Sequence, residues 1–367
     1  MNQKQGQWGS SHPRYRLLEA LYGYSKYRER NMAELDRWRS MYKNLSKRQK
    51  KTLESVVNYK KKLDDIEELI YRNEALCKSI MANAMAYYGI EKSELDAHIE
   101  SATKVGRKAD KTSVTQTLKH FVRDWAAGGI KERTDAFPCI RSMMEGPSMP
   151  NTDGRPLKVL LPGAGLGRLA HEVASIIGYE ITINEWSMYM NTAYRYLQNH
   201  TELQSLSLYP FIDSLSHQGT TEDLHRKVTF PDFPLNPNVL LVEGDFTTAF
   251  SDQYDHYDII VTHFFIDTAR NLMSYFETIQ RLLKKGGRWI NFGPLLYGTG
   301  PFVQLSLDEI INVIEKMGFE FEDISDDCGA LTFEDKKVRG REAEYGFNDR
   351  ALTKNAYKAQ AWVVRNL

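Results

Sequence analysis

The chain has 367 residues, more than one compact domain usually needs, so its length favours two domains. With 42% hydrophobic and 26% charged residues, the composition is that of an ordinary globular protein. Lys and Arg together number 48, and so do Asp and Glu, which excludes a general attraction to nucleic acid or to an anionic membrane.

The first predicted region is helical and runs from Tyr15 to about Tyr87. Apolar residues recur there at three- and four-residue steps, and no proline and no glycine follow Gly23, so little interrupts long helices. The heptad-like pattern is too short for a convincing coiled coil and favours an antiparallel helical hairpin. Its apolar stripe, from Val56 to Cys77, is a candidate surface for pairing two chains into a homodimer.

Residues 101–113 are charged and polar and are predicted to form a loop. A further helix is predicted over residues 114–127, because apolar residues line one face and a glycine pair follows it. The stripe beside that apolar face carries His120 and Arg123.

Residues 144–156, rich in Pro, Gly and Asn, are predicted to separate an N-terminal helical region, residues 1–150, from a second domain, residues 151–367. In the second domain short apolar runs alternate with helical segments, which predicts an α/β fold with a Rossmann-like, mostly parallel sheet and helices on both faces. A proline-rich interruption at about 204–238 is predicted to be an insertion. The expected strands are residues 158–161, 180–184, 239–243, 258–262, 288–292 and 359–365.

The segment from Val159 to Ala170 is predicted to form a strand, a turn and a helix, with Gly163, Gly165 and Gly167 in the turn. Glycines let the backbone turn sharply and approach a ligand closely. The third glycine comes one residue earlier than in the pyrophosphate motif of dinucleotide dehydrogenases. The pattern therefore indicates a nucleotide or nucleoside site, with a purely structural turn as the alternative.

Acidic residues follow the next two predicted strands. Glu185 comes about 20 residues after the glycine turn, the spacing at which a carboxylate can bind the ribose hydroxyls. Asp245 and Phe246 follow the strand after that and are suited to hold adenine by a hydrogen bond and by stacking. The alternatives are an exposed acid for Glu185 and a helix cap for Asp245. The series is typical of S-adenosylmethionine enzymes.

His263 and Asp267 follow the strand predicted over residues 258–262, at the end where open α/β sheets bind their ligands. The alternative for His263 is a buried histidine whose hydrogen bonds are satisfied. For Asp267 it is the N-cap of a helix that begins near Thr268.

Several motifs together resemble the carnosine N-methyltransferase family: LKHFVRDWAAGGIKER, LLPGAGLGRLAHEVA, NEWSMYMN, THFFIDTARN and WINFGPLLYG. The resemblance covers residues 110–367 strongly and also accounts for the insertion. It implies a class I methyltransferase fold with an added helical region. It further implies an enzyme that transfers a methyl group from S-adenosylmethionine to an imidazole nitrogen of a histidine-containing dipeptide, giving anserine from carnosine.

The resemblance also assigns site residues. Asp267 is expected to hold the substrate imidazole with help from Tyr357, and no metal is expected. The chain has histidines at His120 and His263 where the family has glutamine and cysteine, and Gly298 where the family has a histidine. The residues expected to bind the cofactor are His120, Arg123, Gly163, Gly165, Glu185, Asp245, Phe246 and His263.

Imidazole chemistry gives Asp267 a specific role. A free imidazole has a pKa near 6.5, so much of it is neutral at pH 7 and no strong base is needed. A carboxylate that accepts a hydrogen bond from one ring N–H leaves the other nitrogen free to attack, and it stabilises the positive charge that develops. Arg123, with its forked guanidinium, suits the carboxylate of the cofactor's methionine.

Other functions stay open on the sequence alone. They are a nicotinamide-dependent dehydrogenase, a non-catalytic binding protein on the same fold, and a methyltransferase of protein histidine, nucleic acid or another small molecule. The physiological acceptor and the ring nitrogen that is methylated are not determined. We expect a histidine-containing dipeptide as the partner, and neither nucleic acid nor a membrane.

The three cysteines, Cys77, Cys139 and Cys328, lie far apart in the sequence, so we expect neither a disulfide framework nor a CxxC zinc site. No apolar run approaches the roughly 20 residues needed to cross a bilayer, and the first residues lack the apolar core of a secretory signal. These features predict a protein of the cytoplasm, with the nucleus as a second location.

Overall fold

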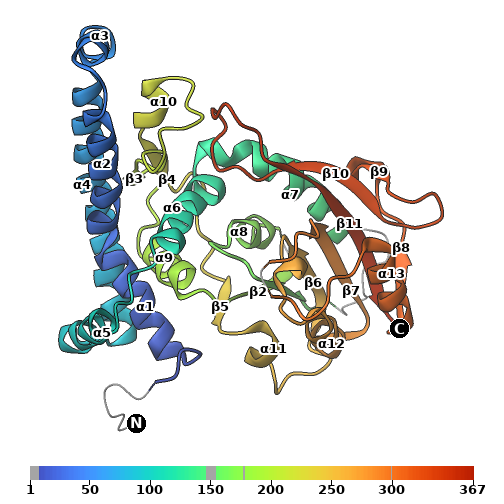
Figure 1. Cartoon of the computed structure of the whole chain (residues 1–367). Helices are drawn as coiled ribbons and strands as arrows, with labels where there is room; N and C mark the ends of the chain where they lie inside the picture. The colour runs from blue at the N-terminus through green and yellow to red at the C-terminus, as the bar shows by residue number, and fades with distance from the viewer. Residues whose placement is uncertain (1–7, 146–153, 177, 299) are drawn as a thin grey trace. The chain divides into compact units, whose positions relative to one another are not determined.

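The computed structural model describes residues 8–145, 154–176, 178–298 and 300–367 (Figure 1). The chain divides into two compact units. Unit 1 comprises residues 1–128, 188–233 and 350–353, and unit 2 comprises residues 129–187, 234–349 and 354–367. The predicted domain boundary at residues 150 and 151 lies outside the described residues, as do most of the segment 144–156 and the first seven residues of the chain.

Unit 1 is mainly helical, as predicted for the N-terminal region. The long helix α4 begins after Asn58, packs against α1 and α2, and ends at Gly89, whose left-handed conformation closes the last turn. The elements of unit 1 are α1 (Pro13–Ser25), α2 (Tyr27–Lys43), α3 (Lys47–Val57), α4 (Tyr59–Tyr88), α5 (Lys92–Lys104), α6 (Lys111–Trp125), α9 (Met188–Gln198), β3 (Leu206–Leu208), α10 (Thr221–His225) and β4 (Val228–Phe230).

The loop predicted over residues 101–113 is largely wrong. Helix α5 continues to Lys104, and α6 already begins at Lys111, where the Asp110 side chain accepts a hydrogen bond from the Ser113 N–H. Charged residues do not end a helix when they face solvent, and an Asp at the N-cap starts the next one. The predicted helix over residues 114–127 corresponds to α6, which buries Phe121 and Trp125.

Unit 2 contains the predicted Rossmann-like sheet, which is confirmed. The strand order is β5-β2-β1-β6-β7-β11-β10-β9; β5, β2, β1, β6 and β7 run parallel, and β11 lies antiparallel beside β7. The strands are β1 (Leu157–Pro162), β2 (Tyr179–Glu185), β5 (Leu240–Glu243), β6 (Tyr257–His263), β7 (Leu283–Gly293), β8 (Phe319–Glu322), β9 (Ala330–Leu331), β10 (Arg339–Glu344) and β11 (Ala356–Asn366).

Both faces of the sheet are buried. Leu160 and Ile260 belong to a core cluster that includes side chains of α12 and α13, and the alternating residues Val159 and Ile259 are buried on the opposite face. The order of the strands reverses at β1 and β6, so a ligand crevice is expected at their carboxyl ends. The helices of this unit are α7 (Ile130–Met144), α8 (Arg168–Ala174), α11 (Phe246–Ala249), α12 (Leu272–Leu282) and α13 (Leu307–Lys316).

The cysteines depart from the expectation. Cys139 of α7 and Cys328 of the short 3-10 helix Asp326–Cys328 form a disulfide, whereas Cys77 of α4 is free and buried. The pair is separated by 189 residues, so only the tertiary fold brings its sulfurs together. Within the described part of the chain, no helix combines the length and apolar composition that a bilayer crossing requires.

Candidate functional site

The glycine turn follows β1 directly. Gly163, Gly165 and Gly167 have φ angles of 63°, 58° and 76°, in the left-handed region that side chains disfavour. A Cβ added at Gly163 would lie 2.2 Å from the Phe265 ring. The turn therefore requires glycine both for its backbone conformation and for the approach of Phe265.

Glu185, at the end of β2, is bound to this turn. Its Oε2 accepts a hydrogen bond from the Gly165 N–H at 2.9 Å, and its Oε1 accepts one from the Ser187 N–H at 2.8 Å. Burial raises the pKa of Glu185, and the hydrogen bonds from the backbone work against that rise. A carboxylate can accept several hydrogen bonds at once, which is the chemistry that binding ribose hydroxyls requires.

Asp245 and Phe246 follow β5. Asp245 is the N-cap of α11 and accepts a hydrogen bond from the Thr247 N–H at 2.8 Å, so its alternative role as a cap holds. The same residue lines the pocket described below, which makes the two roles compatible. Phe246 is buried, and its ring packs edge-on against Phe265 and Tyr275.

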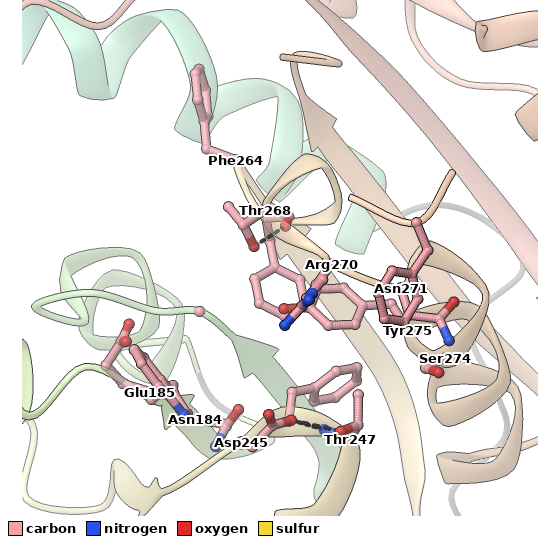
Figure 2. Close-up of a pocket in the computed structure, with 15 residues that line it drawn as sticks. Asn184, Glu185, Asp245, Thr247, Phe264, Thr268, Arg270, Asn271, Ser274 and Tyr275 are labelled. Carbon is pink, nitrogen blue, oxygen red and sulfur yellow. Dashed lines mark hydrogen bonds between the residues drawn. The ribbon is translucent and has the colours of Figure 1, made fainter. Parts of the chain in front are cut away.

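These elements surround a pocket of about 830 Å³ in unit 2. Its size is within the range of small-molecule sites. Figure 2 shows Glu185 and Arg270 on opposite walls of the pocket. The lining residues are Gly163, Asn184, Glu185, Trp186, Asp245, Phe246, Thr247, Phe264, Phe265, Thr268, Arg270, Asn271, Ser274, Tyr275 and Phe302.

Four of the residues predicted to bind the cofactor therefore meet in one pocket: Gly163, Glu185, Asp245 and Phe246. Gly165 reaches the pocket indirectly, through its hydrogen bond to Glu185. Sequence reasoning missed the wall formed by residues 264–275, although the Phe-Phe pair after β6 was a signal for an aromatic surface. Phe302, from the segment after β7, had no sequence signal at all.

Asp267 lies in the short 3-10 helix Ile266–Thr268 and is only 6% exposed. Its Oδ2 accepts a hydrogen bond from the Leu296 N–H at 2.9 Å, and burial raises the pKa of Asp267 to about 6. The alternative that Asp267 caps a helix beginning near Thr268 is wrong. Because Ala269 is extended, α12 begins only at Leu272, with Asn271 at its N-cap.

Phe264 links β6 to an aromatic cluster. It has a φ of 51°, a conformation that is rare for a bulky residue and that often marks a functional site. Its ring stacks on Tyr345 with centroids 5.0 Å apart and meets Tyr357 of β11 edge-on at 6.0 Å. Tyr357, the predicted helper of Asp267, therefore contacts a residue that lines the pocket.

His263, at the end of β6, is half-buried and packs edge-on against Phe137 and Phe264. It does not line the pocket, and this packing favours the alternative of a structural histidine. Its predicted contact with the cofactor stays a prediction.

His120 and Arg123 lie on α6 of unit 1. Arg123 Nε donates to Asp124 Oδ1 at 2.8 Å. Burial works to raise the pKa of Asp124, but Arg123 and His120 outweigh burial and hold that pKa well below its usual range. Burial lowers the pKa of His120. The cofactor contacts expected of both residues stay predictions.

The described residues contain no group of acids, histidines or cysteines arranged to hold a metal ion.

Comparisons with known proteins agree on one family. The family model described as "Carnosine N-methyltransferase" matches residues 100–367. The carnosine N-methyltransferase of Mus musculus is 32% identical over 356 residues, covering 94% of this chain and 83% of the mouse protein. That of Schizosaccharomyces pombe is 30% identical over 333 residues, covering 83% of this chain and 87% of the yeast protein.

Among solved structures, phosphoethanolamine N-methyltransferase 2 of Haemonchus contortus in complex with S-adenosyl-L-methionine is similar with a TM-score of 0.38. It is 14% identical to this chain, and the match covers 58% of this chain and 44% of that protein. A putative S-adenosyl-L-methionine-dependent methyltransferase of Methanococcus maripaludis is 12% identical with a TM-score of 0.39, covering 69% of this chain and 91% of that protein.

Proposed function

Because this chain belongs to the carnosine N-methyltransferase family, we propose that it transfers the methyl group of S-adenosylmethionine to an imidazole nitrogen of carnosine, giving anserine. Membership in the family makes the chain a methyltransferase enzyme. The identity of the methylated nitrogen, and therefore of the product, is proposed from the chemistry of the site. The observation that carries them is the buried Asp267, which lies close in the chain to a pocket at the carboxyl ends of β1 and β6.

The cofactor fits the pocket by its chemistry. Glu185 is a carboxylate acceptor suited to the ribose hydroxyls, Asp245 can accept from the adenine amino group, and the exposed Trp186 offers a stacking surface. The glycine turn allows the methionine part to approach the backbone closely. When bound, S-adenosylmethionine supplies an electrophilic methyl group on a sulfonium. We further propose that Arg123 binds its methionine carboxylate and that His120 contacts the cofactor.

On the acceptor side, Asp267 holds the imidazole. The Leu296 N–H fixes one carboxylate oxygen, and the remaining lone pairs can accept a hydrogen bond from one ring N–H. That bond selects the tautomer whose other nitrogen carries the attacking lone pair. With a pKa of about 6, Asp267 is mostly ionised at pH 7 and offsets the positive charge that the ring gains. Tyr357 and Phe264 provide an aromatic wall for the ring.

The test is a methyl-transfer assay with labelled S-adenosylmethionine and a panel of acceptors. Carnosine, homocarnosine, free histidine and a peptide with an internal histidine are compared, and mass spectrometry locates the methyl group. We expect transfer to a ring nitrogen of the dipeptides. Transfer only to the internal histidine, or to an amine, would overturn the proposal.

We also propose that the protein acts in the cytoplasm, with the nucleus as a second location. The sequence indicated the stripe from Val56 to Cys77 as the surface of a homodimer. Because α4 buries Leu63, Ile70 and Cys77 within unit 1, these residues are not part of that surface. Val56 and Val57, at the end of α3, stay exposed and are the apolar residues that such a dimer would use.

A further inference from the structure

Arg270 is the cationic side chain on the pocket wall. Of the described residues that line the pocket, Arg270 carries a positive charge, and Glu185 and Asp245 carry negative charges. Both carboxylates accept hydrogen bonds from backbone N–H groups. The Arg270 guanidinium, in contrast, contacts no carboxylate in the described part of the chain and lies over the Phe302 ring, 5.1 Å from its centroid.

The backbone holds Arg270 in this position. The Phe302 N–H donates a hydrogen bond to the Arg270 carbonyl at 2.7 Å, and the Leu296 N–H donates to Asp267. Leu296 and Phe302, which both follow β7, are therefore each bonded to the stretch that carries Asp267 and Arg270. Three residues span at most about 11 Å, so Asp267, which does not itself line the pocket, and Arg270, which does, lie within the length of one dipeptide.

We propose that Arg270 binds the carboxylate of the acceptor and thereby selects histidine derivatives with a free carboxylate. This inference rests on the proposed function and adds the group by which the acceptor is recognised. A guanidinium binds a carboxylate through two parallel hydrogen bonds, and an arginine that contacts no carboxylate among the described residues is available for that contact. A histidine inside a protein has no such carboxylate, so the contact disfavours proteins as acceptors.

The cofactor also carries a carboxylate, and the site favours the acceptor as the partner of Arg270. Arg270 lies on the same stretch as Asp267, and the residues that bond this stretch, Leu296 and Phe302, both follow β7. The glycine turn and Glu185, which are assigned to the cofactor, come from β1 and β2 and form a different wall. Binding of the cofactor carboxylate by Arg270 is an outcome that the test below detects.

The experiment compares carnosine with β-alanylhistamine, its analogue without the carboxylate. For the wild type and Arg270→Gln, kcat/KM is measured for both acceptors, and calorimetry gives the Kd of S-adenosylmethionine. Arg270→Lys keeps the charge but loses the fork. Arg365→Gln is the matched control, because it removes an arginine of the same unit that is paired with Glu320 on the sheet. Thermal melts check that each variant is folded.

We expect the wild type to prefer carnosine by about tenfold or more, the scale of a hydrogen bond to a charged group. Arg270→Gln should reduce that preference about tenfold, chiefly through KM, with Arg270→Lys between the two and Arg365→Gln like the wild type. The cofactor Kd should stay within about twofold.

Equal use of both acceptors by the wild type, or an equal loss for both in Arg270→Gln, would overturn the inference and leave the proposed function intact. A weaker affinity of Arg270→Gln for S-adenosylmethionine would assign Arg270 to the cofactor and would also overturn the inference. A wild type that methylates neither acceptor would instead overturn the proposed function.

Discussion

Glu185 and Asp267 each follow a strand of the same sheet, and burial raises the pKa of both, but their hydrogen-bond partners come from different parts of the chain. Glu185 is bound by the Gly165 N–H, from the turn after the neighbouring strand β1, and by the N–H of Ser187, two residues along the chain. Asp267 is bound by Leu296, which comes from the segment after the next strand. Both carboxylates are therefore bonded across one βαβ unit, but Glu185 also has a partner two residues away, whereas Asp267 is bound by Leu296, 29 residues along the chain.

The largest effect is expected on the acceptor side, from Asp267→Asn. Asparagine keeps the shape and accepts the Leu296 hydrogen bond but loses the charge, so turnover should fall about 10²-fold or more, the range for lost electrostatic stabilisers. Affinity for the cofactor should barely change. The measurement is single-turnover methyl transfer beside calorimetry with S-adenosylmethionine.

The same variant should be at least as stable as the wild type. The pKa of Asp267 is about 6 in the folded protein, above the unfolded value near 3.8, so ionisation lowers the free energy of unfolding as pH rises between these values. Removing the charge should therefore raise the free energy of unfolding at pH 7 by up to about 3 kcal/mol. A stable variant with near-native rate would end the assignment of Asp267 to the acceptor.

On the cofactor side, Glu185→Ala should weaken S-adenosylmethionine binding by about 1–3 kcal/mol, the scale of a lost buried hydrogen bond to a charged group. Glu180→Ala, an exposed glutamate on the same strand, is the control and should bind normally. Titration calorimetry on folded variants makes the comparison. If both variants bind the cofactor equally well, Glu185 has no part in binding the ribose.

The two ends of β6 predict different responses to pH. Asp258, at the first end, is bound by Arg155, Lys284 and the Lys158 N–H; burial opposes these contacts, but they prevail and lower the pKa of Asp258 to about 2. Its contribution of about 2 kcal/mol to the free energy of unfolding is present above pH 4 and is lost as pH falls towards 2.

Activity should therefore fail before the fold does. Below pH 6 the rate should decline, because Asp267 and the acceptor imidazole both take up protons, while the melting temperature should hold until about pH 4. Rate–pH profiles and thermal melts over the same range check this. Loss of structure in step with activity would contradict the different environments assigned to the two aspartates.

The smallest effect on the rate is expected in unit 1, at the end of α3. If Val56 and Val57, which are 76% and 53% exposed, pair two chains, replacing both with Asp should convert a dimer to a monomer with little change in rate. Light scattering at micromolar concentration measures the mass. A monomeric wild type would remove the dimer from the proposal.

The sequence by itself determined the parallel sheet, the glycine turn and the pocket positions of Glu185, Asp245 and Phe246. Alternating apolar runs and the φ angles that favour glycine are local properties, so they can be predicted without knowing the rest of the fold. The same holds for the apolar face of α6, whose period predicted Phe121 and Trp125 in the core.

Only the tertiary structure decided which groups meet from distant segments. It joined Cys139 to Cys328, bonded Leu296 to Asp267, and placed Phe302 beneath Arg270, which contacts no carboxylate in the described parts of the chain. The chain after Asp267 is extended, so α12 begins only at Leu272 and Asp267 does not cap it, contrary to the alternative that the sequence offered. Contacts between remote segments depend on how strands and loops stack in space, and no periodicity or spacing within one segment encodes that arrangement.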